Sequence, residues 1–291
     1  MDPQRQRLYK QFVEGTGVCS QYQDETIAGF YATPTYLDAC MDALLNLITI
    51  SPQEVIVEIG CGKGTSTRKI RARNPAKIIA IDPSGPMLRH AQEAFQDDAT
   101  IECKLGSAEE LSRVVERAEK VISINVFRYF EHPENALQEI YRVLNPDGIY
   151  LFNVPVMTAQ EEAVYTPLYK TLEAVLSEEL GKEITLPEMK GVEPKYRKED
   201  MEALAASNGF IVAQYEEMDI TCNEETMHAI HERSVAMAKL MWQGSFTEEQ
   251  IERMVPKLQE RLRQFREGQK GKEFFVGRMA LVCLKKTQRE G

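Results

Sequence analysis

The sequence predicts an α/β protein built on a doubly wound, mostly parallel seven-stranded sheet with an antiparallel last strand. Short apolar segments alternate with helix-like segments through the middle of the chain, the pattern of parallel strands joined by crossover helices. The strand-like segments are apolar on both faces and end at turn residues, as buried parallel strands do. The final apolar segment, 274–286, is long enough to insert as a hairpin partner at the edge of this sheet.

Seven segments are expected to form the strands. They cover residues 55–60, 78–82, 100–106, 121–125, 149–154, 211–220 and 274–286. Asn-Pro-Asp-Gly precedes the fifth strand at 145–148 and favours a turn.

Helices are expected before and between these strands. Residues 33–48 have Thr33 as N-cap, a proline at the first helical position and apolar residues on one face. Residues 134–144 place their apolar residues near one face as well. The segment 198–210 ends its helix at Asn-Gly, a common helix stop.

Two stretches, 156–197 and 221–272, interrupt this alternation and predict helical lid insertions. The first contains a helix at about 167–180, with a threonine cap and a proline at its start. The second contains two amphipathic helices, of which the later opens with a capping box at 247–250 and is expected to kink or stop at Pro256. An extended core or a dimer surface is the alternative role of these insertions.

The whole chain, 1–291, is expected to form a single domain. N-terminal helices cover 1–50, a ligand-binding core covers 51–155, and the insertions at 156–197 and 221–272 carry the lids. The segments 198–220 and 273–286 complete the sheet.

Composition narrows the classes of function. Lysine and arginine total 35 against 45 aspartate and glutamate residues, and this net charge of -10 argues against a general nucleic-acid binder. Six cysteines without a CxxC pair suit reduced thiols better than disulfides or zinc. Neither a signal peptide nor an apolar run of ~18 residues is present. We therefore expect a cytoplasmic monomer or homodimer without nucleic-acid or membrane partners.

The stretch VIVEIGCGKGTSTRKI, residues 55–70, places three glycines directly after the first strand. A phosphate-binding P-loop is excluded, because Lys63 is followed by Gly64 instead of serine or threonine. A dinucleotide fingerprint is weakened but stays open, because its third glycine position is occupied by Thr65.

Four stretches together resemble the class I S-adenosylmethionine-dependent methyltransferases of small-molecule type. EIGCGKGT (58–65) is similar to motif I, and IIAIDPSGPMLRHAQEAF (78–95) to the second motif. LGSAEEL (105–111) is similar to the third motif, and 124–152 to the fourth region and the block after it. The resemblance spans about 55–155 and implies a Rossmann-like methyltransferase fold.

The resemblance implies S-adenosyl-L-methionine as the cofactor. Backbone at the glycine turn would meet its methionine end, and Asp82 would accept both ribose hydroxyls; the alternative role of Asp82 is a helix N-cap. The group that contacts the adenine is expected to be Ser107, the Ala108 amide or Glu109. The residues that the resemblance places at the cofactor are Tyr31, Glu58, Gly60, Cys61, Gly62, Gly64, Asp82, Pro83, Met87, Ser107, Ala108, Glu109 and Asn125.

Candidates for the chemical step follow the fourth strand. Methyl transfer mainly requires alignment of the acceptor with the methyl group, and a base only where the acceptor carries a proton that must leave. Arg128 is expected to hold an anionic acceptor, and Tyr129 or His132 to orient or deprotonate one. The predicted partner is a small-molecule methyl acceptor at oxygen, nitrogen or carbon. His228 and His231 stand three residues apart, but no acidic or cysteine partner with matching spacing accompanies them and the apolar stripe of this helix indicates packing, so no metal is predicted.

Two other classes of function stay open. A nucleic-acid or protein methyltransferase predicts a basic groove or a recognition domain, and the sequence shows neither. An NAD(P)-dependent oxidoreductase or an aminopropyltransferase on a similar fold is distinguished by the ligand that it binds.

Overall fold

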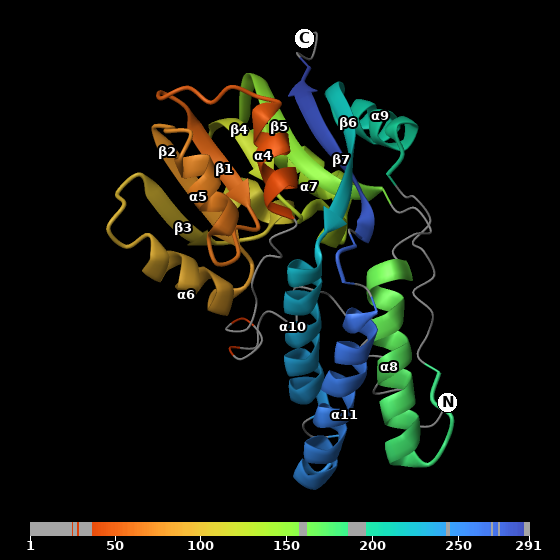
Figure 1. Cartoon of the computed structure of the whole chain (residues 1–291). Helices are drawn as coiled ribbons and strands as arrows, with labels where there is room; N and C mark the ends of the chain where they lie inside the picture. The colour runs from red at the N-terminus through yellow and green to blue at the C-terminus, as the bar shows by residue number, and fades with distance from the viewer. Residues whose placement is uncertain are drawn as a thin grey trace.

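The computed structural model describes Glu25, Ala28 and residues 37–156, 162–185, 196–242, 245–268, 270–272 and 274–287. Its centre is a seven-stranded sheet with the order β3-β2-β1-β4-β5-β7-β6 (Figure 1). The strands are β1 (Val55–Ile59), β2 (Lys77–Asp82), β3 (Ile101–Leu105), β4 (Ala118–Ser123), β5 (Leu144–Val156), β6 (Phe210–Cys222) and β7 (Phe274–Lys286).

The directions of the strands confirm the predicted fold class. β1 to β5 pair in parallel, and β7 is antiparallel to both β5 and β6. The prediction of β7 as an edge strand is wrong, because β7 lies between β5 and β6. Residues 280–284 are all buried, which suits an interior strand, whereas β6 carries many exposed polar residues and forms the edge.

Two predicted strand limits differ from the structure. β4 ends at Ser123, and Asn125 beyond it has a left-handed backbone with φ 61°. The predicted turn at 145–148 lies within the bounds of β5, where the register with β4 shifts and Asp147 has φ 63°. This segment is therefore an irregularity of the strand, because the residues on both sides of it pair with β4.

Helices cover both faces of the sheet. α4 (Asp38–Asn46), α5 (Thr65–Arg71) and α6 (Gly85–Ala94) share one hydrophobic cluster with the sheet. On the other face lie the 3-10 segments η2 (Ala108–Arg113) and η3 (Phe127–Tyr129), together with α7 (Pro133–Val143) and α9 (Lys198–Ser207). Successive β1 residues alternate between these clusters, with Ile56 in the first and Val57 in the second. The sheet is thus doubly wound, as predicted.

The predicted caps have mixed outcomes. α9 ends as expected, with Asn208 as C-cap and Gly209 at φ 82°. Thr33, the predicted cap of the first helix, lies outside the described residues. The predicted start at Pro167 is wrong, because the helix that contains it begins at Glu162.

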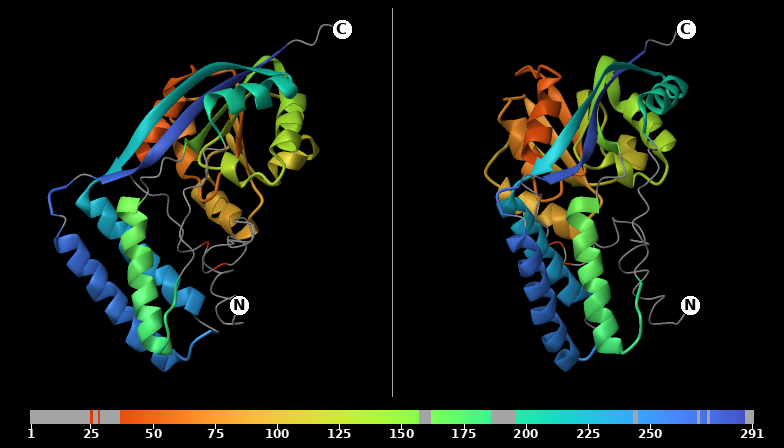
Figure 2. Two further views of the ribbon diagram at one scale, coloured as in Figure 1. Left: turned by 90° about the vertical axis from the view of Figure 1, so that its right-hand side faces the viewer. Right: turned by 45° about the vertical axis from the view of Figure 1, so that its right-hand side comes forward.

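The insertions form a three-helix bundle that projects from one end of the sheet (Figures 1 and 2). It consists of α8 (Glu162–Leu180), α10 (Glu224–Trp242) and α11 (Glu248–Glu267), which share a hydrophobic cluster separate from the two sheet clusters. The capping box is confirmed, since Thr247 and Gln250 exchange hydrogen bonds of 2.9 and 3.3 Å. α11 continues through Pro256, so the predicted interruption is wrong.

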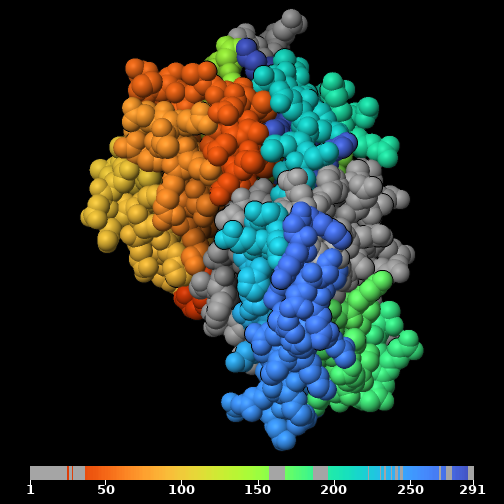
Figure 3. Space-filling model, in the orientation of Figure 1, coloured from red at the N-terminus to blue at the C-terminus, as the bar shows by residue number. Residues whose placement is uncertain are grey.

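Ion pairs on the bundle surface join α8 to α11. Arg253 lies 2.6 Å from Glu179, and both Lys257 and Arg261 pair with Glu178. The space-filling view shows α10 and α11 adjoining on the face toward the viewer (Figure 3). None of the helices described is both long enough and apolar enough to cross a bilayer.

Candidate functional site

The turn between β1 and α5 is formed by three glycines with left-handed backbones. Gly60, Gly62 and Gly64 have φ values of 73°, 54° and 87°, which other residues rarely adopt. A Cβ atom at Gly60 would lie 2.4 Å from Val126 Cγ2, and one at Gly64 would lie 2.4 Å from the Phe95 ring. At Gly62, no described heavy atom would come within 4 Å of it. Gly60 and Gly64 therefore permit close packing, whereas Gly62 leaves an open surface.

Asp82, the last residue of β2, fixes this turn. Its Oδ2 accepts a hydrogen bond of 2.8 Å from the Gly62 N–H, and its Oδ1 accepts one of 2.8 Å from the Ser84 N–H. The side chain is largely buried, and this burial raises its pKa while the two hydrogen bonds oppose the rise. Ser84, and not Asp82, caps α6, because its Oγ accepts from the Met87 N–H at 3.2 Å. Each carboxylate oxygen has a further lone pair for a ligand hydroxyl.

Glu58 is fully buried beneath the turn. Its two oxygens accept hydrogen bonds from Ser66 Oγ at 2.5 Å and from Thr67 Oγ1 at 2.6 Å, which tie β1 to α5. Burial raises the pKa of Glu58 to about 7; the two hydroxyl donors oppose this rise and the charge of Asp82 adds to it. The sequence reasoning missed Ser66 and Thr67, although two hydroxyl residues on an otherwise inward helix face were a usable signal.

Cys61 and Met87 are buried. The Cys61 side chain belongs to the cluster under α4, α5 and α6, and this burial raises the pKa of its thiol well above the ordinary value. Its backbone N–H donates to the Ile81 carbonyl at 3.0 Å, and its thiol lies 3.8 Å from the Gly62 carbonyl oxygen, as a weak donor to it. Met87 lies in the first turn of α6, three residues after the cap Ser84 and four after half-buried Pro83.

The segment after β3 adjoins Asp82. The Gly106 N–H donates to the Asp82 carbonyl at 3.2 Å, and Ser107 follows with an extended backbone before η2 begins. Ala108 is buried, whereas Ser107 and Glu109 are half-buried. The three candidates for the adenine contact are therefore grouped beside Asp82 at one edge of the sheet.

Beyond β4, Asn125 pairs with a residue that the sequence reasoning missed. Asn153 of β5 accepts from the Asn125 N–H at 2.7 Å and donates to Asn125 Oδ1 at 2.6 Å. The signal for Asn153 was an amide within an otherwise apolar strand.

The three catalytic candidates lie between β4 and α7. Arg128 donates a hydrogen bond of 2.5 Å to the Tyr129 hydroxyl, and its guanidinium lies 4.7 Å from the centre of the Tyr129 ring. His132 is exposed at the N-cap position of α7. The structure thus pairs Arg128 with Tyr129, both three or four residues beyond Asn125. Tyr31 lies outside the described residues.

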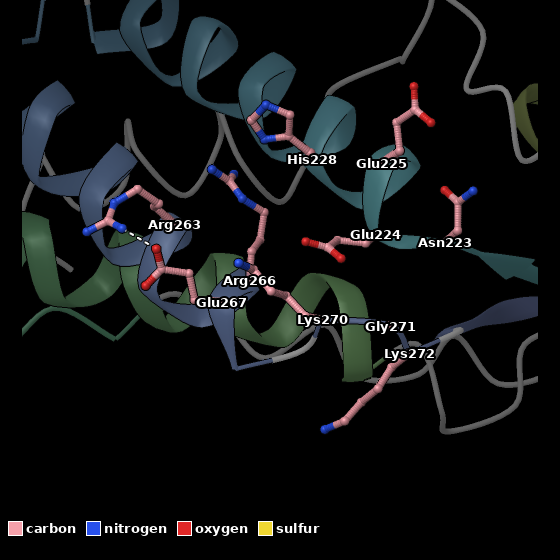
Figure 4. A pocket seen from close by; sticks show the side chains of 10 residues that line it. All are labelled: Asn223, Glu224, Glu225, His228, Arg263, Arg266, Glu267, Lys270, Gly271 and Lys272. Atoms are coloured by element: carbon pink, nitrogen blue, oxygen red, sulfur yellow. Dashed lines mark hydrogen bonds and ion pairs between the residues drawn. The ribbon is translucent and has the colours of Figure 1, made fainter.

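A hollow of about 690 Å³ lies elsewhere, between the start of α10, the end of α11 and the segment before β7 (Figure 4). Its lining is mostly charged and includes His228, Arg266 and an Arg263–Glu267 ion pair. His231 is buried with its ring centre 6.1 Å from that of Phe265, in keeping with packing. Within the described ranges, no three histidine, cysteine or acidic residues are grouped as metal ligands. None of the predicted site residues lines this hollow.

The chain matches a known domain family and several relatives. Residues 57–152 match the family described as "Methyltransferase domain". An uncharacterized methyltransferase-like protein of Schizosaccharomyces pombe is 33% identical over 117 residues, or 40% of this chain and 44% of that protein. A cyclopropane mycolic acid synthase of Mycobacterium tuberculosis is 25% identical over 139 residues, or 46% and 47% of the two chains. The matched part is thus less than half the length of these relatives.

Solved structures share the fold. The cyclopropane synthase from Mycobacterium tuberculosis has a TM-score of 0.50 at 18% identity and covers 98% of this chain and 99% of its own. A phosphoethanolamine N-methyltransferase of Haemonchus contortus, solved with S-adenosylhomocysteine, has a TM-score of 0.51 at 14% identity and covers 99% and 61%. The sheet order and the glycine turn after β1 agree with the methyltransferase domain that residues 57–152 match. Residues 57–152 thus form a methyltransferase domain, and the chain has the fold of the class I S-adenosylmethionine-dependent methyltransferases.

Proposed function

We propose that this chain transfers a methyl group from S-adenosyl-L-methionine to a small-molecule acceptor. The observation that carries the proposal is the Gly62–Asp82 contact, because it places an open, side-chain-free surface beside a buried carboxylate. A zwitterionic tail and a ribose need these two features side by side.

The described residues fit this cofactor. Asp82 would accept from the ribose hydroxyls, and the backbone around Gly62 would line the methionine part. Glu58 would carry negative charge close to the ammonium group, and Met87 with the Ser107–Glu109 segment would border the adenine. When bound, the cofactor supplies a methyl group that its sulfonium already activates.

The chain's own task is then to bind and orient the acceptor and to exclude water. Arg128 and Tyr129 form a charged and hydrogen-bonding pair at the end of β4, which suits an acceptor with an anionic or hydroxyl group. His132 is the neighbouring group that can take a proton. Acceptors at oxygen, nitrogen and carbon all remain within this proposal.

The bundle of α8, α10 and α11 is proposed as the lid over the acceptor. β6 leads into α10 and α11 leads back to β7, so the bundle is anchored at the same end of the sheet at which β5 and β6 finish. Two relatives are named for acyl compounds, the cyclopropane mycolic acid synthase and a malonyl-[acyl-carrier protein] O-methyltransferase of Salmonella typhimurium. Acyl acids and thioesters therefore belong in the first set of acceptors.

The proposal is tested first by calorimetric titration with S-adenosylmethionine, its decarboxylated form and NAD. We expect S-adenosylmethionine to bind most tightly, whereas tighter binding of NAD or of the decarboxylated form would replace the proposal with an oxidoreductase or an aminopropyltransferase. Acceptors are then screened with a labelled methyl group, with nucleic acid and protein as further arms. Labelling of macromolecules alone would contradict a small-molecule acceptor.

A further inference from the structure

A buried amide joins three elements next to the glycine turn. Asn153 is 1% exposed, and it exchanges the two hydrogen bonds with Asn125 described above. Its Nδ2 also lies 3.6 Å from Cys40 Sγ on α4, within reach of a weak hydrogen bond. One side chain of β5 thus connects the end of β4 with α4.

The residue that Asn153 holds has an unusual backbone. Asn125 has φ 61°, a left-handed conformation that is unfavourable for most residues and that asparagine tolerates best after glycine. Asn153 binds both the N–H and the side-chain oxygen of Asn125, so it restrains the backbone and the side chain together. The chain therefore leaves the strand direction at a point that β5 defines.

The backbone at Asn125 positions a residue that packs against the glycine turn. Val126 follows Asn125, and its side chain occupies the space that a Cβ at Gly60 would need. β1 and β4 are neighbours in the sheet, so the ends of the two strands lie side by side. A change in the Asn125 backbone would therefore move the Val126 side chain that packs beside Gly60.

We propose that Asn153 is a positioning residue for cofactor binding: it holds Asn125 and Val126 in the conformation that completes the glycine turn, without touching the cofactor itself. The inference rests on the proposed function, because it takes the glycine turn as the place where S-adenosylmethionine binds. Asn153 acts through Asn125. Substitution of Asn153 is therefore expected to weaken cofactor binding by more than the accompanying loss of folding stability would explain.

The same two strands provide a matched control. Ser123 of β4 and Tyr150 of β5 share a buried hydrogen bond of 2.7 Å between their hydroxyls. Tyr150→Phe removes this one buried hydrogen bond, whereas Asn153→Ala removes the two with Asn125, so only the Tyr150 variant leaves the contacts of Asn125 intact. Its effect reports the loss of a buried polar contact without the change at the glycine turn.

The experiment measures the dissociation constant of S-adenosylmethionine and the urea midpoint for five proteins. These are the wild type, Asn153→Ala, Asn125→Gly, the double variant and Tyr150→Phe. We expect Asn153→Ala to weaken binding about tenfold, which corresponds to ~1.4 kcal/mol. Tyr150→Phe is expected to lower the urea midpoint with an unchanged dissociation constant. In the Asn125→Gly background, Asn153→Ala is expected to have little further effect, because glycine adopts the left-handed backbone unaided.

Other results would overturn this inference, and one of them would overturn the proposed function as well. A wild type that binds no S-adenosylmethionine overturns the proposed function and this inference with it. Tight wild-type binding with an Asn153→Ala constant within twofold of it overturns the inference alone. Additive losses in the double variant, or an equal loss in Tyr150→Phe, also overturn it. If Asn153→Ala does not fold, Asn153→Ser, which keeps a hydroxyl near the Asn125 N–H, is measured against the same criteria with a smaller expected loss.

Discussion

The Gly62 backbone N–H donates a hydrogen bond of 2.8 Å to Oδ2 of Asp82, and this contact joins the turn after β1 to the end of β2. The other oxygen of Asp82 holds the Ser84 N–H at the start of the next turn. One carboxylate thus sets the relative position of two loops that border the proposed cofactor site. Its two roles, in the loop structure and toward the ribose, are expected to be lost together.

Asp82→Ala is expected to weaken S-adenosylmethionine binding by more than tenfold. The variant removes the ribose acceptor, and it leaves the N–H groups of Gly62 and Ser84 without their partner, each at about 0.5–1.5 kcal/mol or more. Titration calorimetry measures the affinity and urea unfolding measures the stability. Asp97→Ala changes an exposed carboxylate and serves as the control. Unchanged affinity in Asp82→Ala would refute the assigned position of the ribose.

Glu58 is expected to make stability and cofactor binding depend on pH in opposite directions. Its folded pKa of about 7 lies above the ordinary 4.5, so the folded protein holds a proton that the unfolded chain has lost between these values. Stability from this group is complete below pH 4.5 and is lost as the pH rises to 7, with a slope of at most ~1.4 kcal/mol per pH unit. The cofactor ammonium favours the ionised carboxylate, so affinity is expected to rise over the same interval.

Glu58→Gln tests both effects. The amide does not titrate, so the part of the stability profile between pH 4.5 and 7 that comes from this residue should disappear. The rise in cofactor affinity with pH should disappear as well. Urea unfolding and calorimetry at several pH values provide the data. If the variant keeps the full pH dependence of the wild type, another group is responsible.

Two glycine substitutions are expected to separate packing from binding. Gly60→Ala places a methyl group 2.4 Å from Val126 Cγ2 at a left-handed φ, so we expect a loss of about 2 kcal/mol or more in unfolding free energy. Gly62→Ala meets no described atom within 4 Å and should lose only ~1 kcal/mol from its backbone. Its methyl group instead enters the proposed binding surface, so cofactor affinity should fall more than stability. Equal affinity in Gly62→Ala and wild type would place the ligand elsewhere.

Local sequence patterns predicted the parts of the site that local structure determines. The glycine turn follows an apolar strand, and Asp82 ends the next strand, so both positions could be inferred from spacing. The conformation at the end of β4 could not, because the left-handed Asn125 is hydrogen-bonded to Asn153, a partner 28 residues away in the sequence. The hydrogen bonds of Glu58 to the start of α5 likewise appear only when the turn is folded.

Tertiary packing also explains why the predicted start of α8 was wrong. Thr166 and Pro167 together favour a helix start, yet α8 begins at Glu162 and passes through both. Leu168, Leu172, Val175 and Leu176 are buried in the bundle cluster, and this tertiary packing outweighs the backbone hydrogen bond that the proline lacks. The position of β7 inside the sheet was missed for a related reason, because strand order is a property of the assembled sheet.

The separate core of the bundle leads to a last prediction. Leu258 of α11 is fully buried among α8 and α10, so Leu258→Ala should destabilise the bundle by about 2–5 kcal/mol. The proposed cofactor residues lie on other elements, so S-adenosylmethionine should bind with nearly wild-type affinity. Transfer to a small-molecule acceptor should fall strongly if the bundle is the lid. Hydrogen exchange of α8, α10 and α11 would follow the local loss of structure.

Arg261→Gln is the matched control, because it changes the same helix on its outer face. It removes an ion pair with Glu178 on the surface, and such pairs contribute little to stability. Acceptor methylation should therefore stay close to that of the wild type. If Leu258→Ala loosens the bundle and methylation is unchanged, the bundle does not enclose the acceptor. If cofactor binding is lost together with the bundle, the two parts fold as one unit, and the separate hydrophobic cluster has no separate stability.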